Sequence, residues 1–219
     1  MTEAEWLTAG EVSRMLRWLG TTRRVPRRST RKLHLFCQAL ATTAVHLAEV
    51  PGAAAVIRVA GEAAERGGPA VGGRAEWERL VLAVPPGWPH LFCRFLVLVG
   101  VGDPSSWWRQ VAEDHAATLA GYARTYLGGP PEGDQCRLLR DIYGNPFCPV
   151  TFSPDWRTDT AVSLARGIYE SREFSAMPIL ADALQDAGCD SADVLDHCRD
   201  PDEVHVRGCW AVDQVLEKE

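Results

Sequence analysis

The stretch TRKLHLFCQALATTAVHLAEV, residues 30–50, contains the pattern that decides the fold class. Its apolar residues recur at intervals of three and four, the spacing of one face of an α-helix, at Leu33, Phe36, Cys37, Leu40, Ala44 and Leu47. Ser29 can cap the first turn, and Pro51 and Gly52 end the pattern. The stretch therefore predicts one helix with a broad buried face.

Helical signals recur on both sides of this stretch, whereas strand signals are scarce. Thr2 and Glu5 fit a capping box, which predicts a helix over residues 3–19. Further helices are predicted at 53–66, 75–83, 91–102, Asp103 to about Leu127, 134–144, 158–171, 176–187, 191–198 and from Gly208 onward. We expect an all-α protein, a multi-helix bundle with a compact C-terminal helical unit.

The glycine- and proline-rich stretch GGPPEG, residues 128–133, is the clearest candidate for a domain boundary. It predicts an N-terminal helical bundle over residues 1–128 and a C-terminal helical unit over 132–219 packed on it. Apolar residues make up 46% of the chain and charged residues 24%, as in globular proteins, so packed cores are expected.

Cysteine usage and hydropathy indicate the compartment. The seven cysteines are an odd number, and the chain begins MTEAEWLTAG without the pattern of a secretory leader. The longest apolar run, residues 91–102, is interrupted by Arg94 and is shorter than the roughly 20 residues that span a membrane. We expect a reduced, cytoplasmic protein without a membrane segment.

The net charge of −6 is distributed unevenly. Residues 23–32, RRVPRRSTRK, are strongly basic, whereas residues 128–219 carry eight Lys and Arg against eighteen Asp and Glu. Nucleic-acid binding is not expected, because no aromatic residue lies among the basic ones and the whole chain is acidic. A basic start and an acidic end can attract each other within one chain or between copies, so self-association stays open.

The densest group of metal-ligating residue types lies in GCDSADVLDHCRDPDEVHVRGCW, residues 188–210. Three thiolates and one imidazole for a tetrahedral zinc site could come from Cys189, Cys198, His205 and Cys209. Zinc ligands usually come in close pairs, and only His205 and Cys209 are so spaced. The alternative is that the cysteines are small buried core residues.

Signatures of known enzymes are absent: the sequence has no nucleophile elbow, phosphate-binding glycine loop or HExxH motif. A Cys/His dyad stays open, pairing Cys37 or Cys93 with one of the histidines His34, His46, His90 and His115. Trp107 and Trp108 are adjacent and point about 100° apart on a helix, so one can face a partner. The candidate interaction residues are Trp107, Trp108 and Arg207.

Three stretches carry a resemblance to a known family: LLRDIYGNPFCPV, IYESREFSAMPILADALQDAGC and DHCRDPDEVHVRGCWAVDQVLEKE. They resemble the C-terminal segment of an uncharacterised family of paralogous bacterial proteins that is abundant in planctomycetes. The likeness is dense over residues 138–219. Family members usually have arginine after the GNPF phenylalanine, where this chain has Cys148, which makes Cys148 a poor ligand candidate. The resemblance implies a bacterial, cytoplasmic protein and names no reaction.

These patterns favour a non-catalytic cytoplasmic protein-interaction or scaffold module, with an unidentified protein partner and no cofactor. The alternative is a small zinc-binding regulatory protein that uses the C-terminal Cys/His cluster. An enzyme of unrecognised type is a further alternative, disfavoured by the missing signatures.

Overall fold

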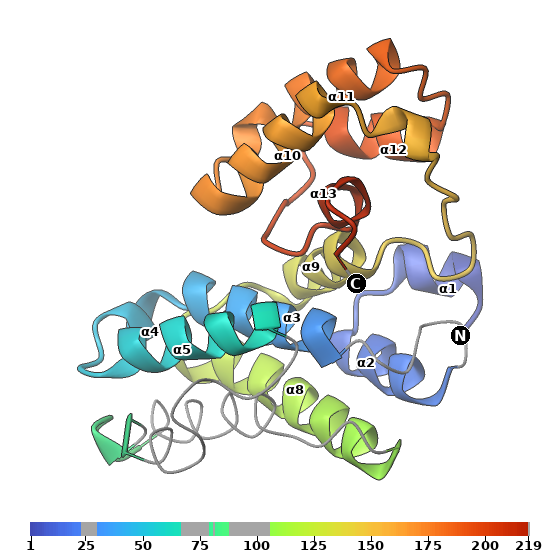
Figure 1. The fold of residues 1–219 in the computed structure, drawn as a ribbon. Helices are drawn as coiled ribbons and strands as arrows, with labels where there is room; N and C mark the ends of the chain where they lie inside the picture. Colours follow the sequence, from blue (N-terminus) through green and yellow to red (C-terminus); the bar gives the residue numbers. More distant parts are fainter. Residues whose placement is uncertain (23–29, 67–78, 81, 88–105, 219) are drawn as a thin grey trace. The chain divides into compact units, whose positions relative to one another are not determined.

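The structure, a computed structural model, describes residues 1–22, 30–66, 79–80, 82–87 and 106–218. Its regular elements in these ranges are all helices, which confirms the all-α prediction (Figure 1). The helix predicted at 91–102 lies outside the described residues, as does Asp103, where the next helix is predicted to start. Most of the basic stretch, residues 23–32, and most of the helix predicted at 75–83 also lie outside them.

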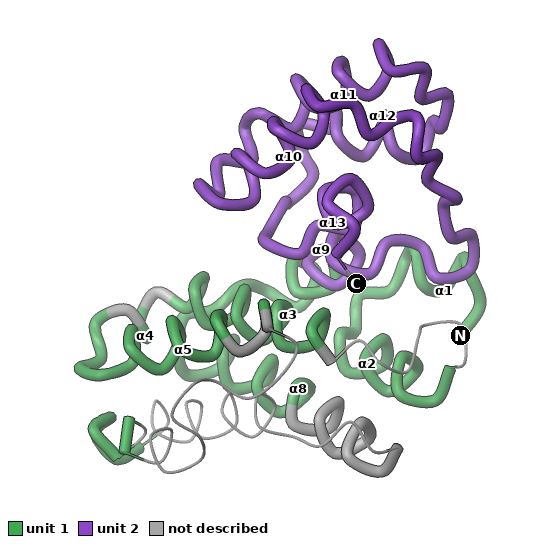
Figure 2. Tube along the Cα trace, in the orientation of Figure 1, with its two compact units in different colours: residues 1–136 green, residues 137–219 purple. Residues whose placement is uncertain are grey.

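The chain divides into two compact units, residues 1–136 and 137–219 (Figure 2). The division falls inside helix α9 (Glu132–Tyr143), a few residues after the predicted boundary. Local hydrogen bonds explain the later division. The side-chain amide of Gln135 donates to the carbonyl oxygens of Ala120 and Pro130, at 3.1 and 2.9 Å, so the first turn of α9 belongs with the N-terminal unit.

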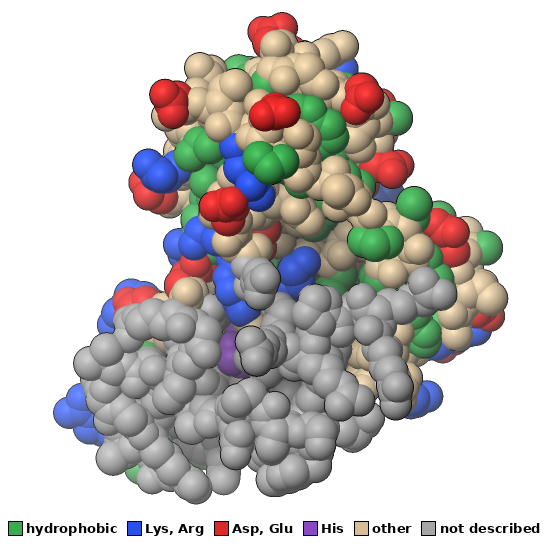
Figure 3. Space-filling model, turned by 45° about the vertical axis from the view of Figure 1, so that its right-hand side comes forward, with side chains coloured by type: hydrophobic (Ala, Val, Ile, Leu, Met, Phe, Trp, Pro, Cys, Tyr) green, Lys and Arg blue, Asp and Glu red, His purple; other side chains and the backbone are tan. Residues whose placement is uncertain are grey.

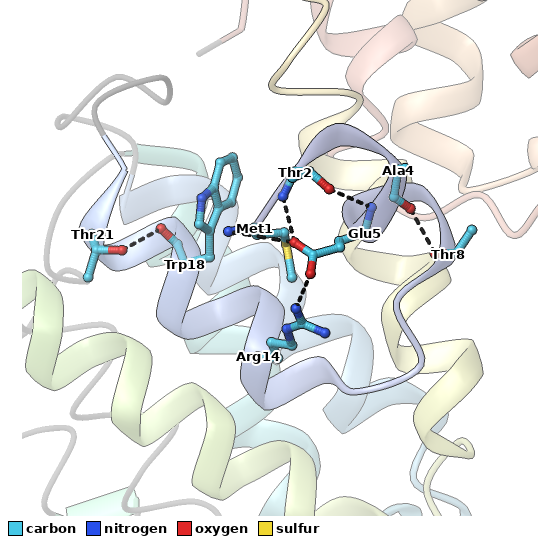
Figure 4. A network of polar contacts seen from close by, with 8 residues as sticks. All are labelled: Met1, Thr2, Ala4, Glu5, Thr8, Arg14, Trp18 and Thr21. Carbon is cyan, nitrogen blue, oxygen red and sulfur yellow. Dashed lines mark hydrogen bonds and ion pairs between the residues drawn. The ribbon is translucent and has the colours of Figure 1, made fainter.

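The capping box at the N-terminus is confirmed (Figure 4). The amide of Glu5 donates to Oγ1 of Thr2 at 3.3 Å, and the amide of Thr2 donates to Oε2 of Glu5 at 2.7 Å. The second oxygen of Glu5 accepts from Arg14, on the next helix. One carboxylate therefore both caps the first helix and ties it to the second.

The prediction of a single helix over residues 3–19 is wrong. The structure has two helices, α1 (Glu3–Thr8) and α2 (Val12–Thr21), with extended backbone at Ala9 between them. Gly10 lies in this break, where its low helix propensity favours the interruption. The break lets the chain fold back, so that the rings of Trp6 and Trp18 lie 5.5 Å apart.

The helix predicted over 30–50 is also interrupted, into α3 (Thr30–Thr43) and α4 (Val45–Ala48). The hydroxyls of Thr42 and Thr43 donate to carbonyl oxygens of the preceding turn, which weakens the end of α3. The pattern itself is confirmed, since its apolar positions are buried.

Two further helices complete the described part of the N-terminal unit, α5 (Ala53–Arg66) and α8 (Ser106–Tyr126). Helix α3 packs against both of them, and α2 packs against α8. The largest buried side chains of this unit include Trp6, Met15, Leu16, Leu19, Phe36, Leu40 and Leu119.

The described part of the C-terminal unit contains four α-helices after α9, close to where the sequence predicts them: α10 (Asp159–Ser171), α11 (Met177–Asp186), α12 (Ala192–Arg199) and α13 (Trp210–Val215). Two short 3-10 helices, η1 (Pro154–Trp156) and η2 (Phe174–Ala176), precede α10 and α11. Helix α11 packs against α10 and α12, and α13 contacts the same two helices. Their shared core includes Ala165, Ile168, Met177, Leu180, Leu184, Val194, Ala211 and Val212.

The acidic character of this unit lies mainly on its surface. Exposed carboxylates lie on or next to α11 and α12, at Asp182, Asp186, Asp190, Asp193, Asp196 and Asp200. Figure 3 shows acidic side chains spread among other residue types over the visible face, not gathered in one patch. In the described ranges no helix combines the length and apolarity needed to cross a membrane.

Candidate metal centre

Four side chains of the C-terminal unit converge on one point, and below they are called the ligand cluster: Asp141, His197, His205 and Cys209. Each offers one atom able to bind a metal, and these four atoms all lie within 4.8 Å of one another. The elements that carry them, α9, α12, the connection after α12 and the start of α13, are marked in Figure 1. This is the one such group in the described part of the chain.

The separations between neighbouring ligand atoms, 2.9–3.8 Å, lie on both sides of those in a tetrahedral zinc site. With zinc bonds of about 2.0 Å to nitrogen or oxygen and about 2.3 Å to sulfur, ligand atoms stand about 3.3–3.5 Å apart. Oδ1 of Asp141 lies 2.9 Å from Nδ1 of His205 and 3.3 Å from Nε2 of His197. Sγ of Cys209 lies 3.2 Å from Nε2 of His197 and 3.8 Å from Nδ1 of His205.

Local structure places each ligand. Asp141 lies in the last turn of α9 and His197 in the last turn of α12. Asp200 turns the chain after α12, because its Oδ1 accepts from the amide of Asp202 at 2.9 Å. The connection then returns through His205 to Cys209, the residue that precedes α13.

Two glycines and a tryptophan next to the ligand cluster help to position its side chains. Gly208, with φ 97°, makes the turn that brings Cys209 back toward the site. The ring of Trp210 packs on that of His197, with centroids 5.0 Å apart. Gly144, with φ 66°, approaches Trp210 so closely that a Cβ there would lie 3.2 Å from the indole. The orientation of His197 is therefore set by packing.

Asp141 differs from the surface acids of this unit because its side chain is fully buried. It lies at the C-terminal end of a helix, where the helix dipole disfavours a negative charge. Burial alone would raise its pKa, but hydrogen bonds with His197 and His205 hold the pKa below its usual value. A buried carboxylate held ionised at this position requires positive charge beside it.

The backbone fixes which oxygen of Asp141 faces the cluster. Oδ2 accepts a hydrogen bond from the amide of Val206 at 2.8 Å. Oδ1 is left to face the two imidazoles, as in a carboxylate that binds a metal through one oxygen. A hydrogen bond to the second oxygen orients such a ligand.

The charges of the ligand cluster suit a divalent ion. Burial, followed by the negative charge of Asp141, raises the pKa of Cys209 well above its usual value, so its thiolate forms only with a cation beside it. One thiolate and one carboxylate balance the charge of a divalent ion when both imidazoles are neutral. The side chains of His205 and His197 are only 7% and 12% exposed, so charge balance matters here.

The remaining nitrogen of His205 is enclosed by the protein. Nε2 is buried and has no hydrogen-bond partner among the described residues. An imidazolium would carry a proton on both nitrogens, and one of its charged N–H groups would be buried without an acceptor. With a metal on Nδ1, the proton of the ring would likewise lie on Nε2, so a ligating His205 also leaves this N–H without an acceptor among the described residues.

The same geometry disfavours a Cys–His–Asp catalytic triad. In a triad, the nucleophile and the carboxylate bind opposite nitrogens of one imidazole. Here Nε2 of His197 faces both Cys209 and Asp141, and Nδ1 of His205 faces the same two side chains. One nitrogen of each ring is directed at a shared centre, an arrangement that could hold an ion.

The structure brings together two of the four ligands that the sequence suggests, His205 and Cys209. Cys189 and Cys198 are outside the ligand cluster and belong to the buried core of the unit. Burial raises the pKa of the Cys198 thiol to about 12, so this side chain stays protonated and behaves as an apolar residue. The core interpretation therefore holds for these two cysteines.

Sequence reasoning missed Asp141 and His197. His197 is the neighbour of Cys198 and lies in the same short stretch, so it could have been recognised as a candidate ligand from its residue type. Asp141 lies more than fifty residues earlier, and nothing in its local sequence separates it from the surface acids. Both fall within the stretches that carry the family resemblance.

The other candidate residues are not assembled into a site by the described structure. Arg207 is half-buried, with its guanidinium 4.6 Å from the centre of the Tyr169 ring, so it packs within the unit. Trp107 and Trp108 lie in α8, but their side chains are outside the described part, as is that of His115.

The Cys/His dyad gains no support. Burial raises the pKa of the Cys37 thiol far above its usual value, which disfavours a nucleophilic thiolate. His46 is exposed, His34 is buried, and Cys93 and His90 lie outside the described residues.

Comparison with known proteins adds no assignment: no protein-family model matches the chain, and no curated protein or solved structure is significantly similar to it.

Proposed function

We propose that this chain binds one zinc ion through the ligand cluster and that the ion has a structural, non-catalytic role. The observation that carries the proposal is the convergence of four ligand atoms, one from each side chain, within 4.8 Å. A nitrogen, nitrogen, oxygen and sulfur donor set is one that zinc accepts in tetrahedral geometry. Four protein ligands leave no position for a water or substrate, which favours a structural role over catalysis.

This proposal adopts the zinc-binding alternative from the sequence analysis in place of the interaction module. An interaction module would be favoured by a set of large apolar side chains on one exposed face. In the described ranges such side chains are Leu7, Leu82, Tyr126 and Ile179, on four separate segments of the chain. They do not single out a docking face, whereas the ligand cluster singles out a metal.

Elemental analysis of the full-length protein, purified without added metal, tests the proposal. We expect about one zinc per chain. After the zinc is removed, added cobalt(II) should bind at the same site. Its spectrum should show the thiolate charge-transfer band and the intense visible bands of tetrahedral cobalt.

The variant Cys209→Ser should lose the charge-transfer band, whereas Cys148→Ser, which removes an exposed cysteine outside the ligand cluster, should keep it. Protein that contains no metal and binds neither zinc nor cobalt would refute the proposal. The ligand cluster would then be a buried hydrogen-bonded group without an ion.

A further inference from the structure

The ligand cluster joins two different parts of the C-terminal unit. Asp141 and His197 lie on helices that end before residue 200, α9 and α12. His205 and Cys209 lie on the segment that follows, residues 200–218, below called the C-terminal segment. An ion bound to all four would therefore cross-link this segment to two helices.

The C-terminal segment has few other anchors along its first half. No apolar side chain of residues 200–207 is buried, whereas the side chain of His205, a member of the ligand cluster, is only 7% exposed. The turn at Asp200 is local, and Arg207 places its guanidinium over the ring of Tyr169. His205 thus lies where the segment has little apolar packing of its own.

The second half of the segment is held by a small apolar set and by Arg157. Helix α13 has six residues, too few to be stable without tertiary contacts. It buries Ala211, Val212 and Val215 in the core of the unit. Arg157 donates to the carbonyl oxygen of Gln214 at 2.9 and 3.2 Å.

The remaining helices of the unit have a core without this segment. Helix α11 packs directly on α10 and α12, and their buried side chains contact one another. These contacts do not pass through α13 or through the ligand cluster. Loss of the ion should therefore affect the segment before it affects these helices.

We infer that the metal ion controls the docking of the C-terminal segment: with the ion bound, residues 200–218 are fixed on α10 and α12, and without it they are released while α10, α11 and α12 stay folded. The inference rests on the proposed metal site and adds its regulatory consequence. Metal availability would then decide whether the apolar face under α13 is covered.

Hydrogen exchange of the full-length protein, with zinc bound and after chelation, tests the inference. The amides of Asp213 and Leu216, which donate to the preceding turn of α13 at 2.9 and 3.0 Å, should exchange at least tenfold faster without zinc. The amide of Ala187, which donates to Ala183 at the end of α11 at 3.2 Å, should change less than twofold.

Two ligand variants make the result independent of any one substitution. His205→Gln removes a ligand inside the C-terminal segment, and His197→Gln removes one outside it. Both should release the same residues as chelation does. Release in His205→Gln alone would indicate a local effect of that side chain and would overturn the inference.

The outcomes separate this inference from the proposed function. Protein that takes up no zinc refutes the metal site itself. Protein that binds one zinc per chain but protects α13 equally with and without it keeps the metal site and refutes the release. Loss of protection across α10 and α11 on chelation also refutes it, because the ion would then be needed by the whole unit.

Discussion

At the scale of single residues, burial separates side chains of the same type into different roles. Asp141 is buried beside two imidazoles, whereas Asp186 is exposed on α11. Cys209 lies in the ligand cluster, and Cys37 lies in an apolar core. The chemistry of each follows from its surroundings and not from its residue type.

Asp141→Asn should weaken zinc binding by at least about 100-fold. Loss of a side chain that only orients a metal ligand lowers the affinity by about 10- to 100-fold, and loss of a ligand itself should cost at least as much as the upper value. Competition with a chromogenic chelator measures the affinity. Asp186→Asn, an exposed change of the same kind, should leave the affinity within about twofold of the parent protein. Equal affinities for the two variants would show that Asp141 is not a ligand.

The Cys37 thiol should make the protein sensitive to alkaline pH. Its pKa is raised in the folded chain by burial, so its contribution to stability is present below the unfolded thiol pKa of about 8.5. As the pH rises above that value, the unfolded chain loses the proton first and stability falls. The thermal midpoint should drop more between pH 8 and about 10 in the parent than in Cys37→Ala. Parallel curves would contradict this assignment.

At the scale of elements, short helices depend on what they pack against. Burying one valine contributes about 1.5–3 kcal/mol, whereas ordering the backbone costs about 1–2 kcal/mol for each residue. Helix α13 buries Val212 and Val215 together with the small Ala211. Trp210 and Leu216 pack against the same core, and the ligand cluster adds a further anchor, because it joins His205 and Cys209 to two earlier helices.

Gly144→Ala should destabilise the C-terminal unit by about 1–2 kcal/mol, because φ 66° is left-handed and a Cβ would press on Trp210. Gly167→Ala is the matched control. Gly167 is exposed inside α10 and a Cβ there meets no atom within 4 Å, so alanine should stabilise by about 0.5–1 kcal/mol. Urea unfolding measures both, and the same sign for both variants would contradict the argument.

At the scale of the whole molecule, the two units have separate sets of buried residues. The core around Trp6, Leu16 and Phe36 belongs to residues 1–136, and the ligand cluster belongs to residues 137–219. A change in one set should therefore leave the chemistry of the other in place.

Trp6→Ala should cost the N-terminal unit about 3–5 kcal/mol, because Trp6 is fully buried. The zinc content per chain should stay the same as in the parent protein. Calorimetry and elemental analysis of the same sample measure the two quantities. Loss of the metal in this variant would show that the ligand cluster needs an intact N-terminal unit.

The sequence by itself determined the helical class and the positions of most helices, because periodicity, caps and glycine stops act over one or two turns. It placed α10, α11 and α12 within about one residue. It failed at the interruptions after α1 and α3, where Gly10 and the hydroxyls of Thr42 and Thr43 weaken the helix within an otherwise continuous apolar pattern. It found His205 and Cys209 because a close pair can be recognised locally.

Only the tertiary structure decided which side chains join that pair. Asp141 reaches the ligand cluster from a helix more than fifty residues earlier, and Cys198 is directed into the core although its neighbour His197 is not. Successive residues of a helix point about 100° apart, so adjacency in sequence does not give a shared site. Convergence of distant ligands depends on how helices pack, which no local pattern specifies.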